Sequence, residues 1–422
     1  MPTYYVTTLN IVIPLFVGLI LIEIFYSRFV NKTFVIRSMD TLSSLCSGLT
    51  NVIRDVLGLT FIIISYGFLV DNLAIFKIES TFIVYILAFI GIDFAGYWVH
   101  RINHSINYFW NHHIIHHSSE EFNLACALRQ SISNFFSLGF IFLIPTSILG
   151  IPAEVITFLA PLHLFAQYWY HTRLIGKLGF LEYILVTPSH HRVHHAINNE
   201  YLDKNLSQVF IIWDKIFGTF QEELDDVPPV YGVKRPVRSW NPILINFKHL
   251  WLLIKDAWRA ENLIDKFRIW FMPTGWRPKD VKNKFPVDFI DSSMDYEKYY
   301  PKLSFKLQAW SWLQYVLIFC FMMYFINNLY RLTFSDAIIY AIFLYISIYG
   351  LTSLMDQEPH AWIFEIIKSS IGFLLIVIYG DWFFLSTYNN DAIIFVQIYF
   401  LISALIVLYF SFFEKKTLPI KS

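Results

Sequence analysis

Histidine is concentrated in one part of this chain. Twelve of the 14 histidines lie between residues 100 and 195, in less than a quarter of the 422 residues. Eight of them form three short boxes, with ligand spacings of four residues in the first box and of three and four in the other two. On a helix, such spacings place side chains on one side. Imidazole is a common metal ligand, so the boxes predict a metal site. They are His100 and His104, then His113, His116 and His117, and finally His191, His194 and His195.

The number of histidines predicts two metal ions rather than one. A structural zinc site is complete with four ligands, whereas the boxes supply eight and His171 offers a ninth. Imidazole also binds copper, iron and nickel, so the histidine count alone leaves the metal open. Zinc cannot change its redox state, whereas two iron ions can bind and reduce oxygen. We therefore expect two iron ions that oxidise a substrate with O2.

Polar side chains near the boxes are candidates for orienting the imidazole rings, because a ligating histidine normally uses its other ring nitrogen in a hydrogen bond. His112 and His190 lie beside the boxes but outside their spacing, and we expect them to support the site or face the surface. The lone His249 and His360 are expected to be packing residues. The polar candidates are Asp93, Asn103, Glu120, Glu121 and Asn123.

The elements that carry these boxes are expected to be membrane helices. The chain is 56% hydrophobic and only 15% charged, which is more apolar than a soluble domain of this length requires. A helix of about 17 or more apolar residues can cross the hydrocarbon core of a bilayer, which is about 30 Å thick. The sequence predicts about nine spans, at residues 8–25, 46–70, 81–99, 135–151, 155–170, 307–326, 337–354, 363–379 and 392–412.

The predicted spans place all three boxes on one side of the membrane. Spans four and five are joined tightly at residues 150–152 and could instead form a hairpin that dips in and returns. Basic residues such as Arg28, Arg101 and Lys415 follow spans one, three and nine, which assigns that side to the cytosol. The N-terminus is then expected outside, and the boxes and the C-terminus in the cytosol. The first span lacks the pattern of a signal peptide and is expected to be retained.

The composition divides the chain into three parts. Between residues 198 and 304, charged residues mix with Trp, Phe and Pro, and no apolar run is long enough to span. We therefore predict an all-α polytopic membrane bundle with a cytosolic, histidine-rich di-metal cap. Its parts are a catalytic membrane domain (1–236), a cytosolic or interfacial amphipathic segment (237–303) and a C-terminal transmembrane bundle (304–422). The net charge of zero predicts no nucleic-acid partner, and the three cysteines lack disulfide or metal spacing.

The three boxes resemble the HxxxH, HxxHH and HxxHH pattern of the fatty acid hydroxylase and sterol desaturase superfamily. Further segments are similar to the branch of that superfamily that cleaves glyceryl ethers, and the resemblance covers nearly the whole chain. It implies a di-iron monooxygenase that uses O2 and tetrahydrobiopterin to hydroxylate the carbon next to the ether oxygen of an alkylglycerol from the bilayer. The hydroxylated lipid then collapses to a fatty aldehyde and a glycerol derivative. The further segments are residues 123–131, 187–195, 203–222, 230–236 and 354–359.

The resemblance also implies roles for single residues. Carried over position by position, it makes the eight box histidines metal ligands and His171 the ninth. Other hydroxylases of the superfamily have a histidine where this chain has Gln167, so Gln167 either binds the metal directly or hydrogen-bonds through water. No residue pattern marks a pterin pocket, and tetrahydrobiopterin is expected from the resemblance alone.

Three alternatives stay open at this point. The enzyme could oxidise another lipid, such as a sterol, a fatty acyl chain or an aminolipid, with a different electron donor. A non-redox metal transporter would need ligands near the middle of the bilayer, whereas these boxes lie at the ends of spans. A structural membrane protein with a metal-stapled cap would not need a redox metal. The expected compartment is the endoplasmic reticulum in a eukaryotic host and the inner membrane in a bacterial one.

Overall fold

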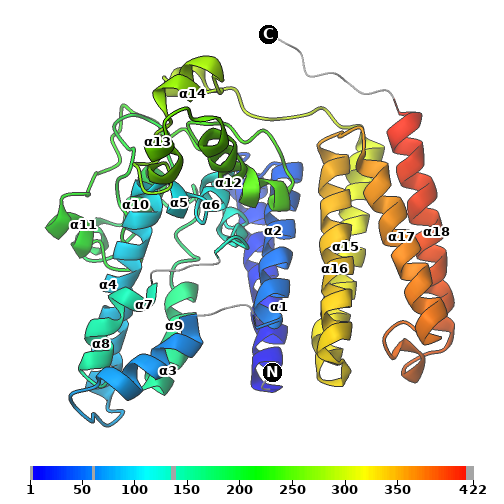
Figure 1. Ribbon diagram of the computed structural model, residues 1–422, viewed down its shortest axis with the longest axis horizontal. Helices are drawn as coiled ribbons and strands as arrows, with labels where there is room; N and C mark the ends of the chain where they lie inside the picture. The colour runs from blue at the N-terminus through cyan, green and yellow to red at the C-terminus, as the bar shows by residue number, and fades with distance from the viewer. Residues whose placement is uncertain (1–2, 59–61, 135–138, 415–422) are drawn as a thin grey trace.

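The computed structural model describes residues 3–58, 62–134 and 139–414. Every regular element within these ranges is a helix, which confirms the predicted all-α class. Figure 1 shows long helices standing side by side, with shorter helices gathered over one end of them. The predicted division into three domains is not tested by this arrangement and stays a prediction.

Six helices in the described ranges are long and apolar enough to cross a membrane. The shortest has 19 residues, which corresponds to about 28 Å of helix at a rise of about 1.5 Å per residue. The chain is therefore a multi-pass membrane protein. The six are α1 (Thr3–Phe25, continued by a π-helical turn Tyr26–Val30), α4 (Phe82–Ser105), α15 (Phe305–Asn328), α16 (Phe334–Met355), α17 (Ala361–Tyr379) and α18 (Asp391–Phe412).

The predicted count of about nine spans is not confirmed, because the other three predicted spans fall on shorter or more polar helices. The span predicted at 46–70 is divided between α2 (Ser38–Val56) and α3 (Ile62–Leu73), and residues 59–61 lie outside the described ranges. One face of α2 buries polar side chains such as Asp40 and Ser44. An apolar run in the sequence therefore did not correspond to one apolar helix.

The spans predicted at 135–151 and 155–170 fall on three short helices, so two full crossings of the bilayer are not confirmed here. Residues 135–138 are not described, and the rest forms α7 (Gly139–Phe142), α8 (Ile144–Ile148) and α9 (Ala153–Phe165). With 13 residues, α9 is about 20 Å long, too short to cross the bilayer. The chain reverses at Gly150, whose φ is +79° and where a Cβ would lie 1.9 Å from the carbonyl oxygen of Phe76. Only glycine fits this turn.

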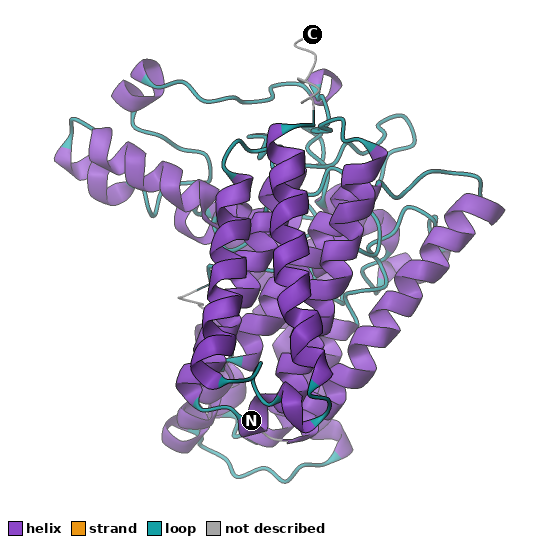
Figure 2. Cartoon of the chain, turned by 90° about the vertical axis from the view of Figure 1, so that its right-hand side faces the viewer, coloured by secondary structure: helices purple, strands orange, loops and turns teal. Residues whose placement is uncertain are grey.

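The C-terminal helices α15 to α18 pack as a four-helix bundle, which faces the viewer in Figure 2. α2 packs against α15 and α16 and so connects the bundle to the histidine-bearing part of the chain. A second connection is made by Asp356, directly after α16. Its carboxylate accepts hydrogen bonds from the backbone N–H of Trp240 and the hydroxyl groups of Ser239 and Tyr299.

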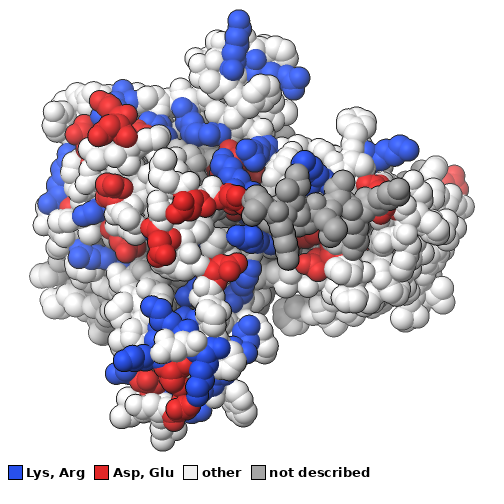
Figure 3. Space-filling model, turned by 90° about the horizontal axis from the view of Figure 1, so that it is seen from above, with Lys and Arg blue, Asp and Glu red and all other residues white. Residues whose placement is uncertain are grey.

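Short helices cover one end of the long ones and form the layer called the cap below. The C-terminal end of α18 lies at this end, whereas the N-terminal end of α1 lies at the opposite end (Figure 1). Figure 3 looks down on the cap and shows Lys and Arg intermixed with Asp and Glu. The cap helices are α5 (Asn107–Trp110), α6 (Ile114–His117), α10 (Pro188–His194), α11 (Ile212–Phe217), α12 (Pro242–Arg259), α13 (Leu263–Arg268) and α14 (Lys279–Lys284).

Candidate metal centre

Four parts of the chain bring nine histidines together where the cap meets the long helices. His100 and His104 lie one turn apart at the C-terminal end of α4. The second box forms α6, with His113 at its N-cap, and the third forms α10, with His195 at its C-cap. His171 lies just beyond the turn that follows α9. The structure thus brings together all nine histidines that the sequence predicts as ligands.

The nine rings form two groups, and within each group one nitrogen from each ring lies within 4.8 Å of those from the other rings. Each HxxHH box contributes to both groups, because positions i, i+3 and i+4 project at slightly different angles from one side of a helix. This is the division expected for two neighbouring metal ions. The first group is His100, His104, His113, His117 and His194, and the second is His116, His171, His191 and His195.

Within each group, Nε2 atoms face one another at short distances. The Nε2 of His171 lies 3.3 Å from that of His116 and 2.9 Å from that of His191. In the first group, the Nε2 atoms of His100 and His113 are 2.8 Å apart. On the outer side, the Nδ1 of four rings donates to a backbone carbonyl oxygen. These bonds run from His100 to Leu206 (2.7 Å), from His116 to Arg129 (3.2 Å), from His171 to Gln167 (2.9 Å) and from His194 to Lys204 (3.0 Å).

These outer hydrogen bonds determine what the inner nitrogens can do. A neutral imidazole carries one N–H, so a ring whose Nδ1 donates to a carbonyl presents a bare lone pair at Nε2. His116 and His171 face each other with two such lone pairs, and neither can donate to the other. The Nε2 of His194 is buried and has no hydrogen-bond partner in the described part of the chain. A cation in each group would bind these lone pairs, so the residues present fit metal ions.

Burial keeps the four rings of the second group neutral at physiological pH. Desolvation lowers the pKa of His171 and His195 well below the ordinary value, and neighbouring rings lower it further. Burial also lowers the pKa of His116 to about 4. A histidine must be unprotonated to bind a metal, so these rings are ready to do so at pH 7. Because neutral ligands do not compensate the charge of a cation, a metal bound here would be strongly electrophilic.

One short loop orients three of the five rings in the first group. Asp203 accepts from the Nδ1 of His104 at 3.1 Å, and the carbonyls of Lys204 and Leu206 accept from His194 and His100. The loop reaches this shape through positive φ angles at Asp203 and Asn205, 55° and 53°. Sequence reasoning missed these partners because most are backbone carbonyls. The short polar residues, which tolerate positive φ, were the one signal of a tight loop.

A buried carboxylate holds this loop in place. The side chain of Asp214 in α11 is fully buried and accepts the backbone N–H of Leu206 at 2.7 Å and that of Ser207 at 2.8 Å. It also accepts the hydroxyl of Thr219 at 2.6 Å. Asp214 was not among the predicted site residues, and it makes no contact with any of the nine rings. It acts on the metal centre through the backbone of the loop.

Two predicted polar candidates, Gln167 and Asp93, do not contact the nine rings through their side chains. The side-chain amide of Gln167 lies 3.2 Å from the Nδ1 of His163, and its backbone carbonyl, rather than its side chain, accepts from His171. Asp93 accepts from the backbone N–H of Val209 and Phe210, and it lies 2.7 Å from the Nε2 of His163. Asp93 thus ties α4 to α9 and to the segment before α11, and it touches none of the nine rings.

The other candidates organise loops or stand apart from the rings. Asn123 donates to the carbonyl of Val35 and accepts the N–H of Ala125. Glu120 accepts the N–H of Tyr299, Glu121 pairs with Arg37, Arg173 and Lys298, and His190 takes part in the capping box of α10. Neither Asn103 nor His112 belongs to the two groups. Buried His249 donates to the carbonyl of Asn107, and His360 is exposed.

A long apolar helix that ends in the first box, with the other two boxes on short cap helices beside it, defines the class of histidine-box membrane hydroxylases. The family model described as fatty acid hydroxylase matches residues 85–219, a range that contains all nine converging histidines. No solved structure matches this chain.

Similarity to characterised proteins identifies the family within this class. The alkylglycerol monooxygenase of Homo sapiens is 33% identical over 377 residues, which cover 87% of this chain and 82% of that protein. The alkylglycerol monooxygenase of Danio rerio is 32% identical over 367 residues, 86% of this chain and 80% of that one. The ornithine lipid hydroxylase OlsE of Rhizobium tropici is 28% identical over 136 residues, 32% of this chain and 41% of its own. The chain belongs to the alkylglycerol monooxygenase family and is an oxidoreductase of the monooxygenase type that acts in lipid metabolism.

Proposed function

We propose that this enzyme uses two histidine-bound iron ions, O2 and tetrahydrobiopterin to oxidise the carbon next to the ether oxygen of alkylglycerols. The similarity to alkylglycerol monooxygenases over most of both chains supports this substrate class. The observation that carries the metal assignment is the pair of imidazole groups, with nine histidine ligands in total. Two irons there would supply the oxidising power that O2 chemistry on an unactivated C–H bond needs.

The overall reaction balances with one two-electron donor. One oxygen atom of O2 is inserted into the C–H bond beside the ether oxygen, and the other leaves as water with two electrons and two protons from the reduced pterin. The resulting hemiacetal breaks its C–O bond to give a fatty aldehyde and the free glycerol hydroxyl. The chain's own contribution is to hold the neutral rings through the carbonyls of Gln167, Lys204 and Leu206.

We also propose that the cap and the C-terminus face the cytosol. Support comes from the basic loops predicted on that side. In a eukaryotic host this would place the enzyme in the endoplasmic reticulum, and in a bacterial host in the inner membrane.

The test is an assay of the detergent-solubilised protein with a pyrene-labelled alkylglycerol and O2, with and without tetrahydrobiopterin. The His113→Ala variant is compared with His360→Ala, which changes an exposed histidine outside the centre. Pterin-dependent aldehyde that is lost only in His113→Ala supports the proposal. An iron-loaded protein that makes no aldehyde would contradict the substrate and move the search to other lipids, such as the ornithine lipids named for OlsE.

A further inference from the structure

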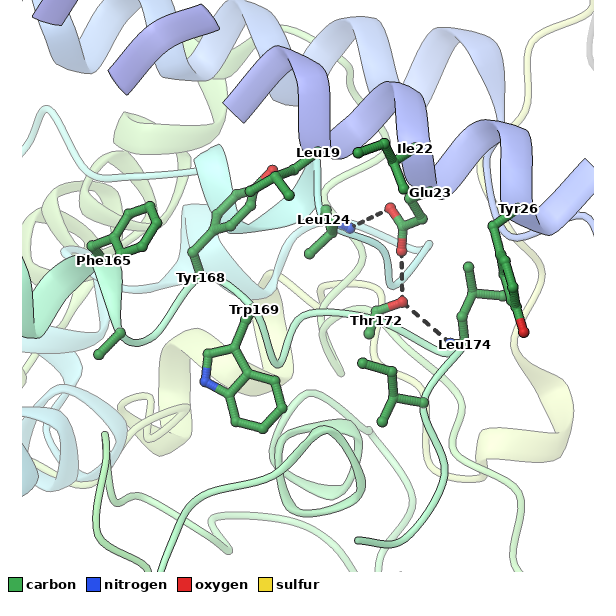
Figure 4. A pocket seen from close by; sticks show the side chains of 12 residues that line it. Leu19, Ile22, Glu23, Tyr26, Leu124, Phe165, Tyr168, Trp169, Thr172 and Leu174 are labelled. Carbon is green, nitrogen blue, oxygen red and sulfur yellow. Dashed lines mark hydrogen bonds between the residues drawn. The ribbon is translucent and has the colours of Figure 1, made fainter. Parts of the chain in front are cut away.

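A pocket of about 370 Å³ lies between α1 and the segment 165–175 that carries His171 (Figure 4). Most of its lining is apolar or aromatic, with Leu19 and Ile22 from α1 and Phe165 and Trp169 from the opposite wall. Ile22, Phe165 and Trp169 are also exposed at the lipid-facing surface, by 65%, 42% and 38%. A lipid chain could therefore enter the pocket sideways from the bilayer.

One carboxylate, Glu23, lines this apolar pocket. It is 4% exposed and lies within a membrane-spanning helix, where an ionisable group is costly and usually functional. One of its oxygens accepts the hydroxyl of Thr172 at 2.6 Å, and the other accepts the backbone N–H of Leu124 at 2.8 Å, as Figure 4 shows. A carboxylate can accept about four hydrogen bonds, so Glu23 is held in position and still has acceptor capacity.

A second polar group of the pocket has no partner. Tyr168 is 5% exposed, and its buried hydroxyl makes no hydrogen bond within the described part of the chain. A buried hydroxyl without a partner is unfavourable, and its presence in a cavity wall points to a ligand that completes it. Glu23 can only accept while it is ionised, whereas Tyr168 can donate. Together they match a ligand that carries both a hydroxyl group and an acceptor oxygen.

The pocket is also next to the metal centre. Thr172 directly follows His171, and Ala166 and Tyr168, which flank Gln167, line the pocket. The carbonyl of Gln167 accepts from the Nδ1 of His171. The segment 165–175 therefore has one face on the pocket while it carries a ring of the second imidazole group.

We propose that this pocket binds the lipid substrate where its alkyl chain joins its headgroup. A free hydroxyl of the headgroup donates to Glu23, Tyr168 donates to an oxygen of the same lipid, and the alkyl chain lies along Leu19, Ile22 and Trp169. This assignment rests on the proposed function for the substrate class. It adds the residues that select a lipid with a free hydroxyl over one without.

The binding test needs no turnover. An alkylglycerol with a photoreactive diazirine in its chain is crosslinked to the full-length protein in nanodiscs, and labelled peptides are mapped by mass spectrometry. We expect label on α1 and on residues 165–175, competed by unlabelled alkylglycerol. Glu23→Gln should lower labelling about 10-fold, since one of the two acceptor oxygens is replaced by a donor amide group, and Tyr168→Phe should lower it several-fold. Glu154→Gln, at an exposed position of α9, is the control and should label like the wild type.

The outcomes separate this inference from the proposed function. Specific labelling of the pocket in a protein that makes no aldehyde would sustain the inference while the proposed ether cleavage fails. Label elsewhere, equal labelling by an analogue whose hydroxyls are methylated, or unchanged labelling of both pocket variants would overturn it. Tyr168→Phe removes a group that the fold does not use in a hydrogen bond, so it tests the pocket even if Glu23→Gln unfolds. Displacement of the probe by ordinary phospholipids alone would mark a structural lipid site and contradict substrate binding.

Discussion

At the scale of single residues, the character of the centre depends on which nitrogen of each ring carries the proton. Carbonyl oxygens accept hydrogen bonds from the Nδ1–H of His100, His116, His171 and His194, which leaves the Nε2 lone pair free for a cation. A backbone carbonyl cannot be removed by mutating its residue. The loop can instead be tested by mutating Asp214, whose carboxylate holds it in place.

We expect Asp214→Asn to weaken metal binding without removing any ligand. The amide would place a donor against the N–H groups of Leu206 and Ser207, and the loop that orients His100 and His194 would shift. Loss of such support typically lowers metal affinity or activity about 10- to 100-fold. The measurement is metal content after dialysis against graded chelator. Asp225→Asn, whose side chain is 99% exposed, is the matched control, and equal metal retention in both variants would refute this role.

Sequence reasoning identified the residues that converge but not what orients them. The spacing of the boxes was sufficient because a helix converts three- and four-residue steps into one face. The partners of the rings are mainly carbonyls of residues 204 and 206, and a carbonyl has no residue-type signature. For the same reason Gln167 was noticed for its side chain, whereas its backbone oxygen makes the contact.

At the scale of elements, the C-terminal bundle contains a polar network at membrane depth. Lys368 of α17 is 1% exposed and lies 2.6 Å from Glu365, and its ammonium also donates to Tyr399 and Ser403 of α18. Gln314 of α15 donates to Ser403 as well. Every helix in this network is a candidate span, so the buried network joins three spans.

Removing one member of this pair should be worse than removing both. Lys368→Met leaves an uncompensated carboxylate and should cost about 3–5 kcal/mol, as for other buried pairs. The double variant Lys368→Met, Glu365→Leu should recover most of that loss, which denaturant unfolding in detergent would measure. Lys284→Met, at an exposed pair on the cap, is the control and should unfold like the wild type. A double variant that is no more stable than the single one would contradict this account.

The helix α12 provides a pH-dependent test of cap packing. Burial lowers the pKa of His249 to about 3, with Arg235 lowering it further, whereas an unfolded histidine has a pKa near 6.5. The folded state therefore loses stability as the pH falls from about 6.5 towards 3, at up to about 1.4 kcal/mol per pH unit. His249→Gln should reduce this acid loss in thermal unfolding between pH 7 and 5, and exposed His360→Gln should not. Identical profiles of wild type and His249→Gln would contradict the buried neutral histidine.

At the scale of the whole molecule, the first and last helices, α1 and α18, have their outer ends on opposite sides of the helical layer. The N-terminal end of α1 and the C-terminal end of α18 are at opposite ends in Figure 1, and the cap is on the α18 side. In sealed vesicles, a tag at the C-terminus should be cleaved from the same side as a protease site inserted near exposed Asp225. A tag at the N-terminus should be cleaved from the other side. Tags that are both accessible from one side would contradict this topology.

Hydropathy predicted which segments are apolar but not how each is folded. The four C-terminal spans were predicted correctly because each is one uninterrupted helix of at least 19 residues. Spans one and three were also predicted correctly, as α1 and α4. The other apolar runs of the N-terminal half are interrupted, at Gly150 by a turn that only glycine allows. The predicted spans at 46–70 and 155–170 also fail, because α2 has a polar face and α9 has only 13 residues.

The central claim is that nine histidines bind two iron ions, and metal analysis combined with X-ray absorption tests it most directly. Protein purified from iron-supplied cells should contain two irons per chain, with nitrogen ligands and little sulfur. His194→Ala and His171→Ala, one from each imidazole group, should each lower the iron content, and His360→Ala should not. A single metal ion per chain, or two zinc ions that persist under iron-rich growth, would contradict the account.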